Sequence, residues 1–541
     1  MKKFLVIIVG IVQGVTASAY DLFADGVYYN ILSETEKTLA VTNGDLEWGP
    51  TDYMGDVVIP ATVEYEGETW QVVALDGAVF HSHMMLNSIV INAEIKIIPD
   101  RAFYMCTDLH TIILPNSVDS IGDTNFYKSL SLKTISLPEQ LAHVGTYLFY
   151  ESGIKHIKIP EAMTTIPEGT FFYCEELESI ELPNSIKSIG AEAFHDCKNL
   201  RSIVFPNQLE SIGFNAFNES GLEAADIPNS VTFIDELAFG TNLNLTYVHL
   251  PETLTQMSFG VFCGCPRLTS IVIPETVEYI GGHALQAVSI DTLKIPEGVK
   301  YIGEGAFCGN EKLCSINIPK AITDVEAFMF SGCTSLARIS LHEGITHIGE
   351  YAFSGCSALD SLVLPNSITY IDEAAFNECS SLTEIVFPPL LENIAPYVCC
   401  LCTSLKRVVI PEKINWVYDY AFGFCYALTD MYSLSRKPPM CAMGFKDVPL
   451  EQVTLHVYNP YSYKNDYLWN KFGNIVEIEA GDLAIKNIHA DNEASKYYSL
   501  DGSHSPSPRK GMNIIRCKNG RVRKVLIKNK VEVNAKGRNG A

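Results

Sequence analysis

The stretch Leu182–Leu200, which reads LPNSIKSIGAEAFHDCKNL, recurs in variant form along most of this chain and decides its fold. Its proline, Pro183, belongs to a series spaced by 22 or 23 residues, in which His342 replaces proline once. A fixed period of this length predicts a stacked repeat array rather than a globular enzyme core. The series comprises Pro115, Pro138, Pro160, Pro183, Pro206, Pro228, Pro251, Pro274, Pro296, Pro319, Pro365, Pro388 and Pro411.

The residues before each proline alternate between apolar and polar side chains, as in Ser179-Ile180-Glu181-Leu182. This pattern predicts a short, half-buried strand that ends at the proline, because proline has no N–H to continue a ladder. The apolar positions are aliphatic or Phe in every unit except at Ala225, so we expect them to face inward. The polar positions are expected to face outward.

Two further columns follow the proline. An aliphatic residue such as Ile189 stands six positions later, often followed by glycine, which indicates either a positive φ or a close approach of two backbones. A phenylalanine column then predicts a buried aromatic spine. It comprises Phe103, Phe126, Phe171, Phe194, Phe239, Phe262, Phe307, Phe330, Phe353, Phe376 and Phe422.

Nine of the cysteines also keep the register of the repeat. A metal site or disulfide framework would need close pairs with complementary spacing, which one residue per coil does not supply. We therefore favour a ladder of small buried thiols, formed by Cys106, Cys174, Cys197, Cys265, Cys333, Cys356, Cys379, Cys402 and Cys425. Some of the remaining cysteines could pair in an oxidising compartment, namely Cys263, Cys308, Cys314, Cys399, Cys400, Cys441 and Cys517.

The charge of the chain is uneven. The 541 residues carry a formal net charge of −24, which argues against general nucleic-acid binding because that requires Lys and Arg at the phosphates. From Ala484 onward, however, 13 Lys and Arg stand against 4 Asp and Glu, so a basic tail follows an acidic body.

The first 19 residues have the pattern of a secretory signal. Lys2 and Lys3 precede the apolar run 4–12, and Ala17-Ser18-Ala19 forms a small-residue cleavage site. The run is shorter than the ~20 residues that span a bilayer, and no later stretch is apolar enough to span one. We therefore expect a chain without a transmembrane span after processing, secreted or held at a bacterial cell surface.

These columns resemble the BspA-like bacterial leucine-rich repeats, related to the Treponema pallidum type of repeat. The resemblance rests on the unit quoted first and covers about residues 86–434. It implies a right-handed leucine-rich-repeat solenoid with a parallel sheet on one face and short strands or turns on the other. It also implies an exported surface protein that adheres to host matrix or to other bacteria. A protein of this kind is not expected to be an enzyme or to bind a cofactor.

The ends are expected to differ from the array. Residues 20–85 are interpreted as a β-rich N-terminal cap with an irregular first repeat and a hairpin tip near Glu66. Residues 435–480 are interpreted as a cap in which a strand at 454–457, a helix around 467–472 and a strand at 475–478 follow one another. The basic tail 481–541 resembles the C-terminal β-modules of exported Bacteroidetes proteins, some of which are sorting signals. The alternative interpretation of its basic residues is an exposed pair of strands.

The outward strand positions are the candidate contact surface for an extracellular protein or glycan. Most are small, so the charged and aromatic exceptions are the candidate ligand-binding residues, although β-propensity explains many outward side chains. No nucleophile, phosphate-loop or metal motif is evident, and a structural envelope component without a ligand is the alternative. The candidates are His156, Lys158, Glu181, Asp226, Tyr247, His249, Lys294, Arg338, Glu384 and Arg407.

Overall fold

The computed structural model describes residues 20–44 and 53–478, together with the backbone of four strands between residues 494 and 527. The chain divides into two compact units. The first takes its described residues from 20–408, 413–428 and 440–448, and the second comprises 409–412, 429–439 and the chain from 449 onward. The expected signal segment, residues 1–19, lies outside the described residues.

The first unit begins with a five-stranded sheet of order β1-β2-β3-β6-β5. Its strands are β1 (Leu22–Ala24), β2 (Val27–Ser33), β3 (Thr38–Thr42), β5 (Thr62–Tyr65) and β6 (Glu68–Leu75). The predicted hairpin tip is confirmed, since β5 and β6 pair antiparallel and both Glu66 and Gly67 between them have positive φ. The first coil is formed by β4 (Gly55–Ile59), which pairs in parallel with β7 (Leu86–Ile91).

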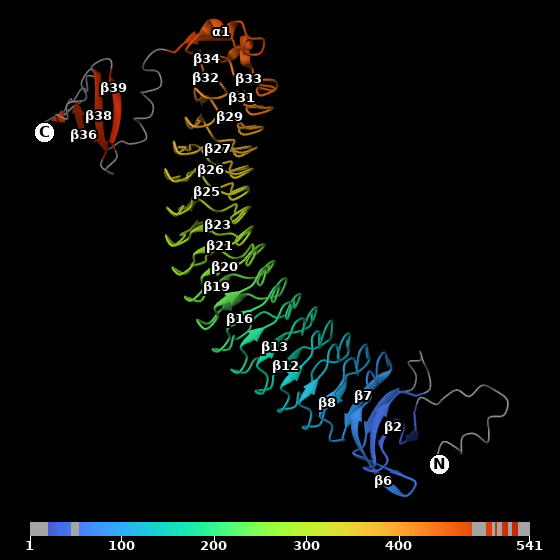
Figure 1. Cartoon of the computed structure of the whole chain (residues 1–541). Helices are drawn as coiled ribbons and strands as arrows, with labels where there is room; N and C mark the ends of the chain where they lie inside the picture. The colour runs from blue at the N-terminus through green and yellow to red at the C-terminus, as the bar shows by residue number, and fades with distance from the viewer. Residues whose placement is uncertain are drawn as a thin grey trace, which may run out of the picture. The chain divides into compact units, whose positions relative to one another are not determined.

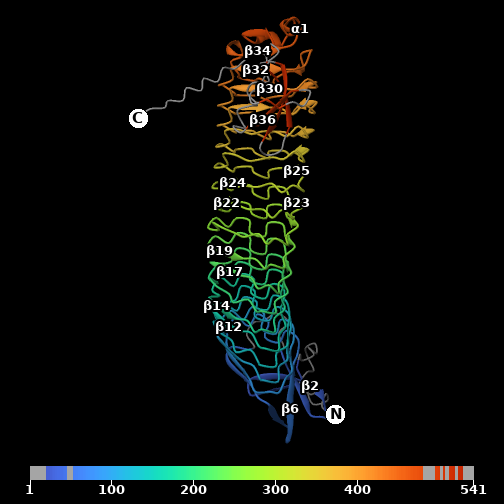
Figure 2. The same ribbon diagram turned by 90° about the vertical axis from the view of Figure 1, so that its left-hand side faces the viewer.

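Each following repeat forms one coil, and the coils stack one upon another (Figures 1 and 2). The strand before the proline belongs to a first ladder of parallel strands, in which, for example, His156 lies opposite Ser179. The first ladder comprises β9 (Thr111–Ile113), β12 (His156–Lys158), β14 (Ser179–Glu181), β17 (Ala224–Asp226), β19 (Tyr247–His249), β22 (Thr292–Leu293), β24 (Ser315–Ile316), β28 (Glu384–Val386) and β30 (Arg407–Ile410).

A second ladder of two-residue strands forms on another side of each coil, where the sequence places the aliphatic–glycine pair. The pairing is again parallel, with Ser188 opposite Ser211. The predicted solenoid is thus confirmed. The second ladder comprises β8 (Ile97–Ile98), β10 (Ser120–Ile121), β11 (His143–Val144), β13 (Thr165–Ile166), β15 (Ser188–Ile189), β16 (Ser211–Ile212), β18 (Phe233–Ile234), β20 (Gln256–Met257), β21 (Tyr279–Ile280), β23 (Tyr301–Ile302), β25 (Asp324–Val325), β26 (His347–Ile348), β27 (Tyr370–Ile371), β29 (Asn393–Ile394), β31 (Trp416–Val417) and β33 (Met440–Cys441).

The core of each coil is built from the predicted columns. The middle residue of strands such as β12, β14 and β19 is buried while its neighbours are exposed, as the alternation predicts. The phenylalanine spine is continuous from Phe80 to Phe262, with successive ring centroids 5.0–5.8 Å apart. It includes Phe149 and Phe217, which the sequence analysis left out of the column, and Leu285 interrupts it.

The glycines of the second ladder are required by close approach and not by their φ. A Cβ at Gly190 would lie 2.7 Å from the backbone nitrogen of Glu168 in the preceding coil. None of the glycines in this column has a positive φ, namely Gly122, Gly145, Gly190, Gly213, Gly281, Gly303 and Gly349. The left-handed positions lie two residues later, at Thr124, Tyr147 and Glu192. The sequence allowed either a positive φ or a close backbone approach at these glycines, and only the close approach is correct.

Replacing Gly190 with Ala is therefore expected to lower the free energy of unfolding by about 1–3 kcal/mol, because the added methyl overpacks against backbone atoms. Gly298 is the matched control. It too lacks a positive φ, but its added Cβ would come no closer than 3.6 Å to a neighbouring atom. Urea denaturation of both variants tests this, and an equal loss in the two would contradict the close-approach explanation.

The ladder cysteines are buried thiols, as predicted, and each has a structural role. The Cys174 thiol donates to the Phe149 carbonyl at 2.9 Å and the Cys333 thiol to the Phe307 carbonyl at 3.2 Å, each time one coil back along the spine. Asn242 occupies the same position and donates to the Phe217 carbonyl. In these coils the column therefore supplies a hydrogen-bond donor to the preceding coil. Every cysteine whose side chain is described, on or off the ladder, is a free thiol.

The second unit contains the parallel strands β32 (Asp430–Ser433), β34 (Thr454–Val457) and β35 (Asn474–Glu477). The two predicted cap strands are present, but the predicted helix is misplaced. The helix α1 is Pro460–Lys464, because Asn459 caps it and proline stands at its first position, and 469–471 forms only a 3-10 turn.

The cap helix is held by aromatic side chains. Tyr463 is fully buried, and its hydroxyl donates to the Ser435 carbonyl at 3.0 Å, while the Trp469 indole donates to the Pro439 carbonyl at 2.8 Å. Further on, β36 (Ala494–Ser499), β37 (His504–Ser505), β38 (Gly511–Cys517) and β39 (Val522–Ile527) form an antiparallel sheet. No helix within the described part of the chain is long and apolar enough to cross a membrane.

Candidate ligand-binding surface

The outward side chains of the first ladder form the candidate surface that the sequence predicts, and the structure collects the predicted residues into small groups. The first group stands on β12 and β14, where Lys158 lies opposite Glu181 and the His156 ring lies 2.8 Å from the Ser179 hydroxyl. All these side chains are exposed. The group therefore presents both charges and an imidazole to solvent.

The second group stands on β17 and β19. His249 Nδ1 lies 3.2 Å from the Asp226 carboxylate, and Tyr247 stands on the same strand with half of its surface exposed. An exposed aromatic ring beside a polar pair is the composition of many protein contact sites. Tyr247 is the one predicted candidate that adds a large apolar surface.

Lys294 and Arg338 stand apart from these groups. Lys294 pairs with Glu275 at 2.9 Å and Arg338 with Asp360 at 3.6 Å, and both cations remain largely exposed. Pairs of this kind contribute little to stability, so they leave the cations available to a partner.

Arg407 departs from its predicted role as an exposed contact residue. It is buried, with 8% of its surface exposed, because its guanidinium turns along the sheet and pairs with Glu384. Charges this deeply buried are retained when they are paired. Arg407 therefore belongs to the structure of the array, and Glu384 is occupied as its partner.

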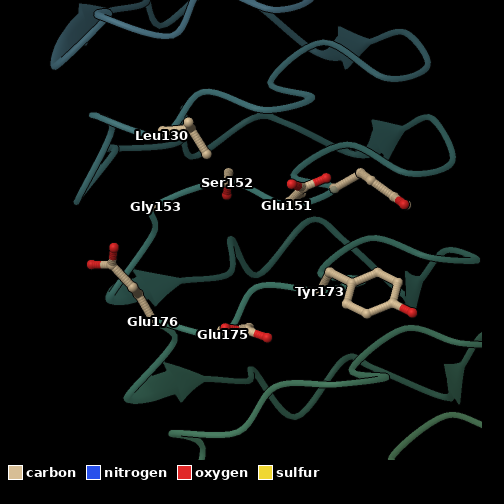
Figure 3. A pocket seen from close by; sticks show the side chains of 8 residues that line it. Leu130, Glu151, Ser152, Gly153, Tyr173, Glu175 and Glu176 are labelled. Atoms are coloured by element: carbon tan, nitrogen blue, oxygen red, sulfur yellow. The ribbon is translucent and has the colours of Figure 1, made fainter.

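A groove of about 560 Å³ lies at the corner of the coils near β12 (Figure 3). Its lining comes from three successive coils, and Tyr150, Tyr173, Glu175 and Glu176 supply its aromatic and acidic groups. It forms where the unit is one residue shorter, so that Ser152-Gly153 replaces the usual corner. The shortening brings the backbones together, since a Cβ at Gly153 would lie 2.0 Å from the Leu130 carbonyl oxygen.

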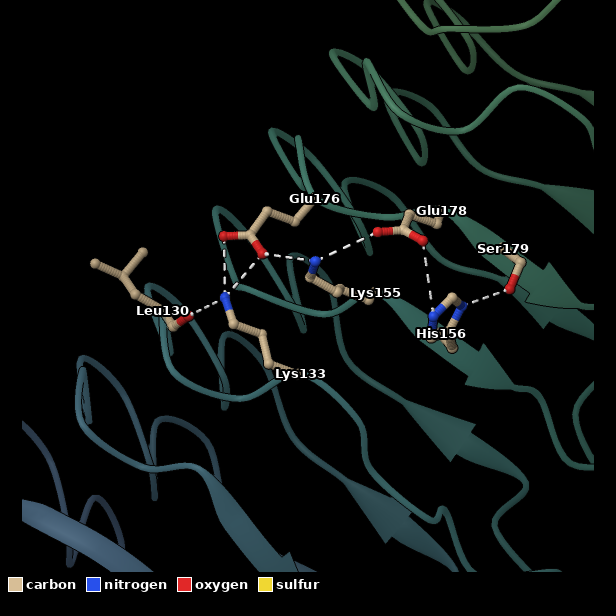
Figure 4. A network of polar contacts seen from close by, with 7 residues as sticks. All are labelled: Leu130, Lys133, Lys155, His156, Glu176, Glu178 and Ser179. Carbon is tan, nitrogen blue, oxygen red and sulfur yellow. Dashed lines mark hydrogen bonds and ion pairs between the residues drawn. The ribbon is translucent and has the colours of Figure 1, made fainter.

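A polar network joins this groove to the first ladder (Figure 4). The Lys133 ammonium contacts Glu176 at 2.9 Å and donates to the Leu130 carbonyl, and Lys155 lies between Glu176 and Glu178. Glu178 in turn lies 3.8 Å from His156 Nε2. The predicted residue His156 is thereby the outer end of a network that begins at the groove.

A stack of surface rings runs beside the groove. Tyr104, Tyr127 and Tyr150 stack with centroids 4.5 Å apart, and the stack continues through Phe172 to His195. Burial in this stack raises the pKa of the Tyr127 and Tyr150 hydroxyls. These hydroxyls therefore stay protonated, and able to donate hydrogen bonds, to a higher pH than an ordinary tyrosine.

Neither the groove nor the ring stack was predicted from the sequence. The sequence does contain a signal for the ring stack, because the residue after the spine phenylalanine is aromatic in several consecutive units. The sequence also contains a signal for the polar network. Lys133, Lys155 and Glu178 occupy the same repeat position in successive coils, so opposite charges stand next to one another there. The groove had a weaker signal, the 22-residue unit, whose effect on surface shape depends on the packing of three coils.

Comparisons with known proteins agree on the repeat class. The family model described as "BspA type Leucine rich repeat region" matches residues 74–201, 187–314 and 300–429. A leucine-rich repeat protein from Bacteroides ovatus has a similar structure, with 27% identity and a TM-score of 0.56 over 73% of this chain and 95% of that one.

Two further solved structures are more distant. A leucine rich cell surface protein from Faecalibacterium prausnitzii is 20% identical with a TM-score of 0.40, over 78% of this chain and 95% of that one. The leucine rich repeat protein of T. pallidum is 24% identical with a TM-score of 0.25, over 46% of this chain and 91% of that one. No curated protein matches the sequence.

Proposed function

The chain belongs to the BspA-type leucine-rich repeat family, and from that premise we propose that it is an exported cell-surface protein that binds an extracellular protein or glycan through the outer face of its first ladder. The observation that carries the proposal is the exposure of charged and aromatic side chains on strands whose inward residues are fully used by the core. Such side chains are not used by the core, which leaves them accessible to a partner.

Export is supported by the signal pattern of residues 1–19 and by the family. For the basic tail 481–541 we propose a role in sorting or envelope attachment, and the alternative is an exposed strand pair without such a role. Cell fractionation of the full chain and of a chain ending at residue 486 tests this assignment, because loss of surface localisation in the truncated chain supports sorting.

Removing the exposed side chains of the outer face is expected to weaken binding by about tenfold or more, because truncated aromatic and Arg anchors dominate interface energies. The variant combines Tyr247→Ala, His249→Ala and Arg338→Ala, and leaves the buried Arg407 intact. The measurement is binding of purified protein to immobilised matrix proteins, mucin and bacterial surface glycans.

The matched control combines Tyr301→Ala and Tyr370→Ala on the second ladder, where both rings are also exposed. The control is expected to bind like the unaltered protein. If the unaltered protein binds nothing in these assays, the binding proposal fails and a structural role in the envelope takes its place. Equal loss in both variants would place the contact outside the first ladder.

A further inference from the structure

The groove beside β12 is an open depression with the volume of a small-ligand site. Its volume of about 560 Å³ lies within the range of ligand pockets, about 300–1,000 Å³. Its floor is backbone drawn together at Gly153, where a side chain would collide with the Leu130 carbonyl. The Lys133 ammonium also reaches this floor, because it lies 2.7 Å from the point where a Cβ at Gly153 would stand.

Tyr173 is turned out of the neighbouring ring stack. The stacked rings cover one another's faces, whereas the Tyr173 ring is nearly perpendicular to Phe172, at 84°, and to His195, at 87°. It lines the groove and 37% of its surface is exposed. A ring in this position offers an uncovered aromatic surface to whatever enters the groove.

The three carboxylates of the groove are each compensated by a lysine. Glu151 pairs with Lys128 at 3.2 Å, and Glu176 with Lys133 at 2.9 Å. Glu175 pairs with Lys198 at 2.6 Å, and this hydrogen bond helps to raise the pKa of the lysine and keep it charged. The lining itself holds the three carboxylates, and each has a lysine partner beside the groove, so every acceptor of the lining has a charged donor next to it.

We propose that this groove binds a neutral glycan. A free cation or a Lys-rich peptide would be attracted by uncompensated carboxylates, but these are already paired. A sugar ring instead packs its C–H face on Tyr173, while its hydroxyls, which both donate and accept, exchange hydrogen bonds with Glu175, Glu176 and Lys133. The ion pairs need not break for this, because a carboxylate accepts up to about four hydrogen bonds and an ammonium donates up to about three.

The inference rests on the proposed function only in taking the chain to be a binding protein, and it concerns a site separate from the outer-face groups. Its probe is a panel of neutral oligosaccharides titrated against the purified chain. Tyr173→Ala is expected to weaken binding by about tenfold or more, and Tyr173→Phe to retain most of it. Raising NaCl from about 0.05 to 0.5 M is expected to leave the affinity unchanged, because no net charge is neutralised.

The matched control is Phe424→Ala. Phe424 occupies the same repeat position in another coil, with φ of 63° against 57° at Tyr173, so both changes act on the same backbone conformation. Equal loss of binding in the two variants would overturn the proposal. So would binding of Lys-rich peptides that disappears with salt, or retention of no neutral oligosaccharide. If the protein binds no neutral oligosaccharide but still binds a ligand through its outer face, the groove proposal is wrong and the proposed function stands.

Discussion

Raising the pH above 9 is expected to destabilise the repeat array steeply, because the ladder thiols ionise readily only when the chain unfolds. Burial raises the pKa of Cys106, Cys174, Cys265 and Cys333 from 9.0 to about 12. It raises the pKa of Cys197, Cys356, Cys379 and Cys425 well above 9.0.

The sign of the effect follows from proton binding. Below pH 9 both the folded and the unfolded chain hold these protons, so the thiols add no pH dependence. Between pH 9 and 12 the unfolded chain releases protons that the folded chain keeps, and stability falls by up to about 1.4 kcal/mol per pH unit for each thiol. Urea denaturation followed by circular dichroism from pH 8 to 10.5 measures this slope.

The control replaces two titrating thiols with the residue that already performs their role elsewhere in the column. Asn242 donates to the Phe217 carbonyl and Asn310 to the Leu285 carbonyl, so Cys265→Asn with Cys333→Asn keeps a donor in each coil. This double variant is expected to reduce the alkaline slope by up to about 2.7 kcal/mol per pH unit. An unchanged slope would show that other groups cause the alkaline destabilisation.

Replacing Phe194 with Ala is expected to lower local stability by about 3–5 kcal/mol, since a fully buried ring leaves a cavity in a close-packed spine. Its centroid lies 5.2 Å from that of Phe171 and 5.0 Å from that of Phe217, and both would lose a stacking partner. Because repeat arrays open locally, hydrogen exchange of amides between residues 171 and 217 is the suitable measurement.

Two further variants serve as controls for this prediction. Phe194→Leu is expected to lower stability by no more than about 1.5 kcal/mol, because Leu285 already fills the spine in one coil. His195→Ala changes the adjacent half-buried residue and is expected to have an effect of about 1 kcal/mol or less. Comparable losses at Phe194 and His195 would contradict the role assigned to the spine.

The repeat columns made the fold predictable before any coordinates. A column that recurs in register gives the same information many times. The inward aliphatics and the buried thiols were therefore predicted correctly, and so was the spine except for Phe149 and Phe217. Single occurrences carried less information. The cap helix was misplaced toward Trp469 because its start depends on one cap, Asn459, and one proline.

The candidate site was predictable only in part. Alternation along a strand shows which side chains face outward, and it placed His156, Asp226 and His249 on the surface. It does not show whether an outward side chain turns back onto a neighbour, and Arg407 is buried for that reason. The paired carboxylates of the groove likewise depend on contacts between different coils.

The sequence by itself determined the solenoid, its inward columns and its ladder of thiols, because each depends on interactions repeated at one fixed spacing. Only the tertiary structure decided why the second-ladder glycines are needed, where the ring stack runs and where the groove opens. These features depend on distances between neighbouring coils, as between Gly190 and Glu168 or between Gly153 and Leu130. A one-residue shortening is visible in the sequence, but the cavity that it opens depends on how three stacked coils close around it.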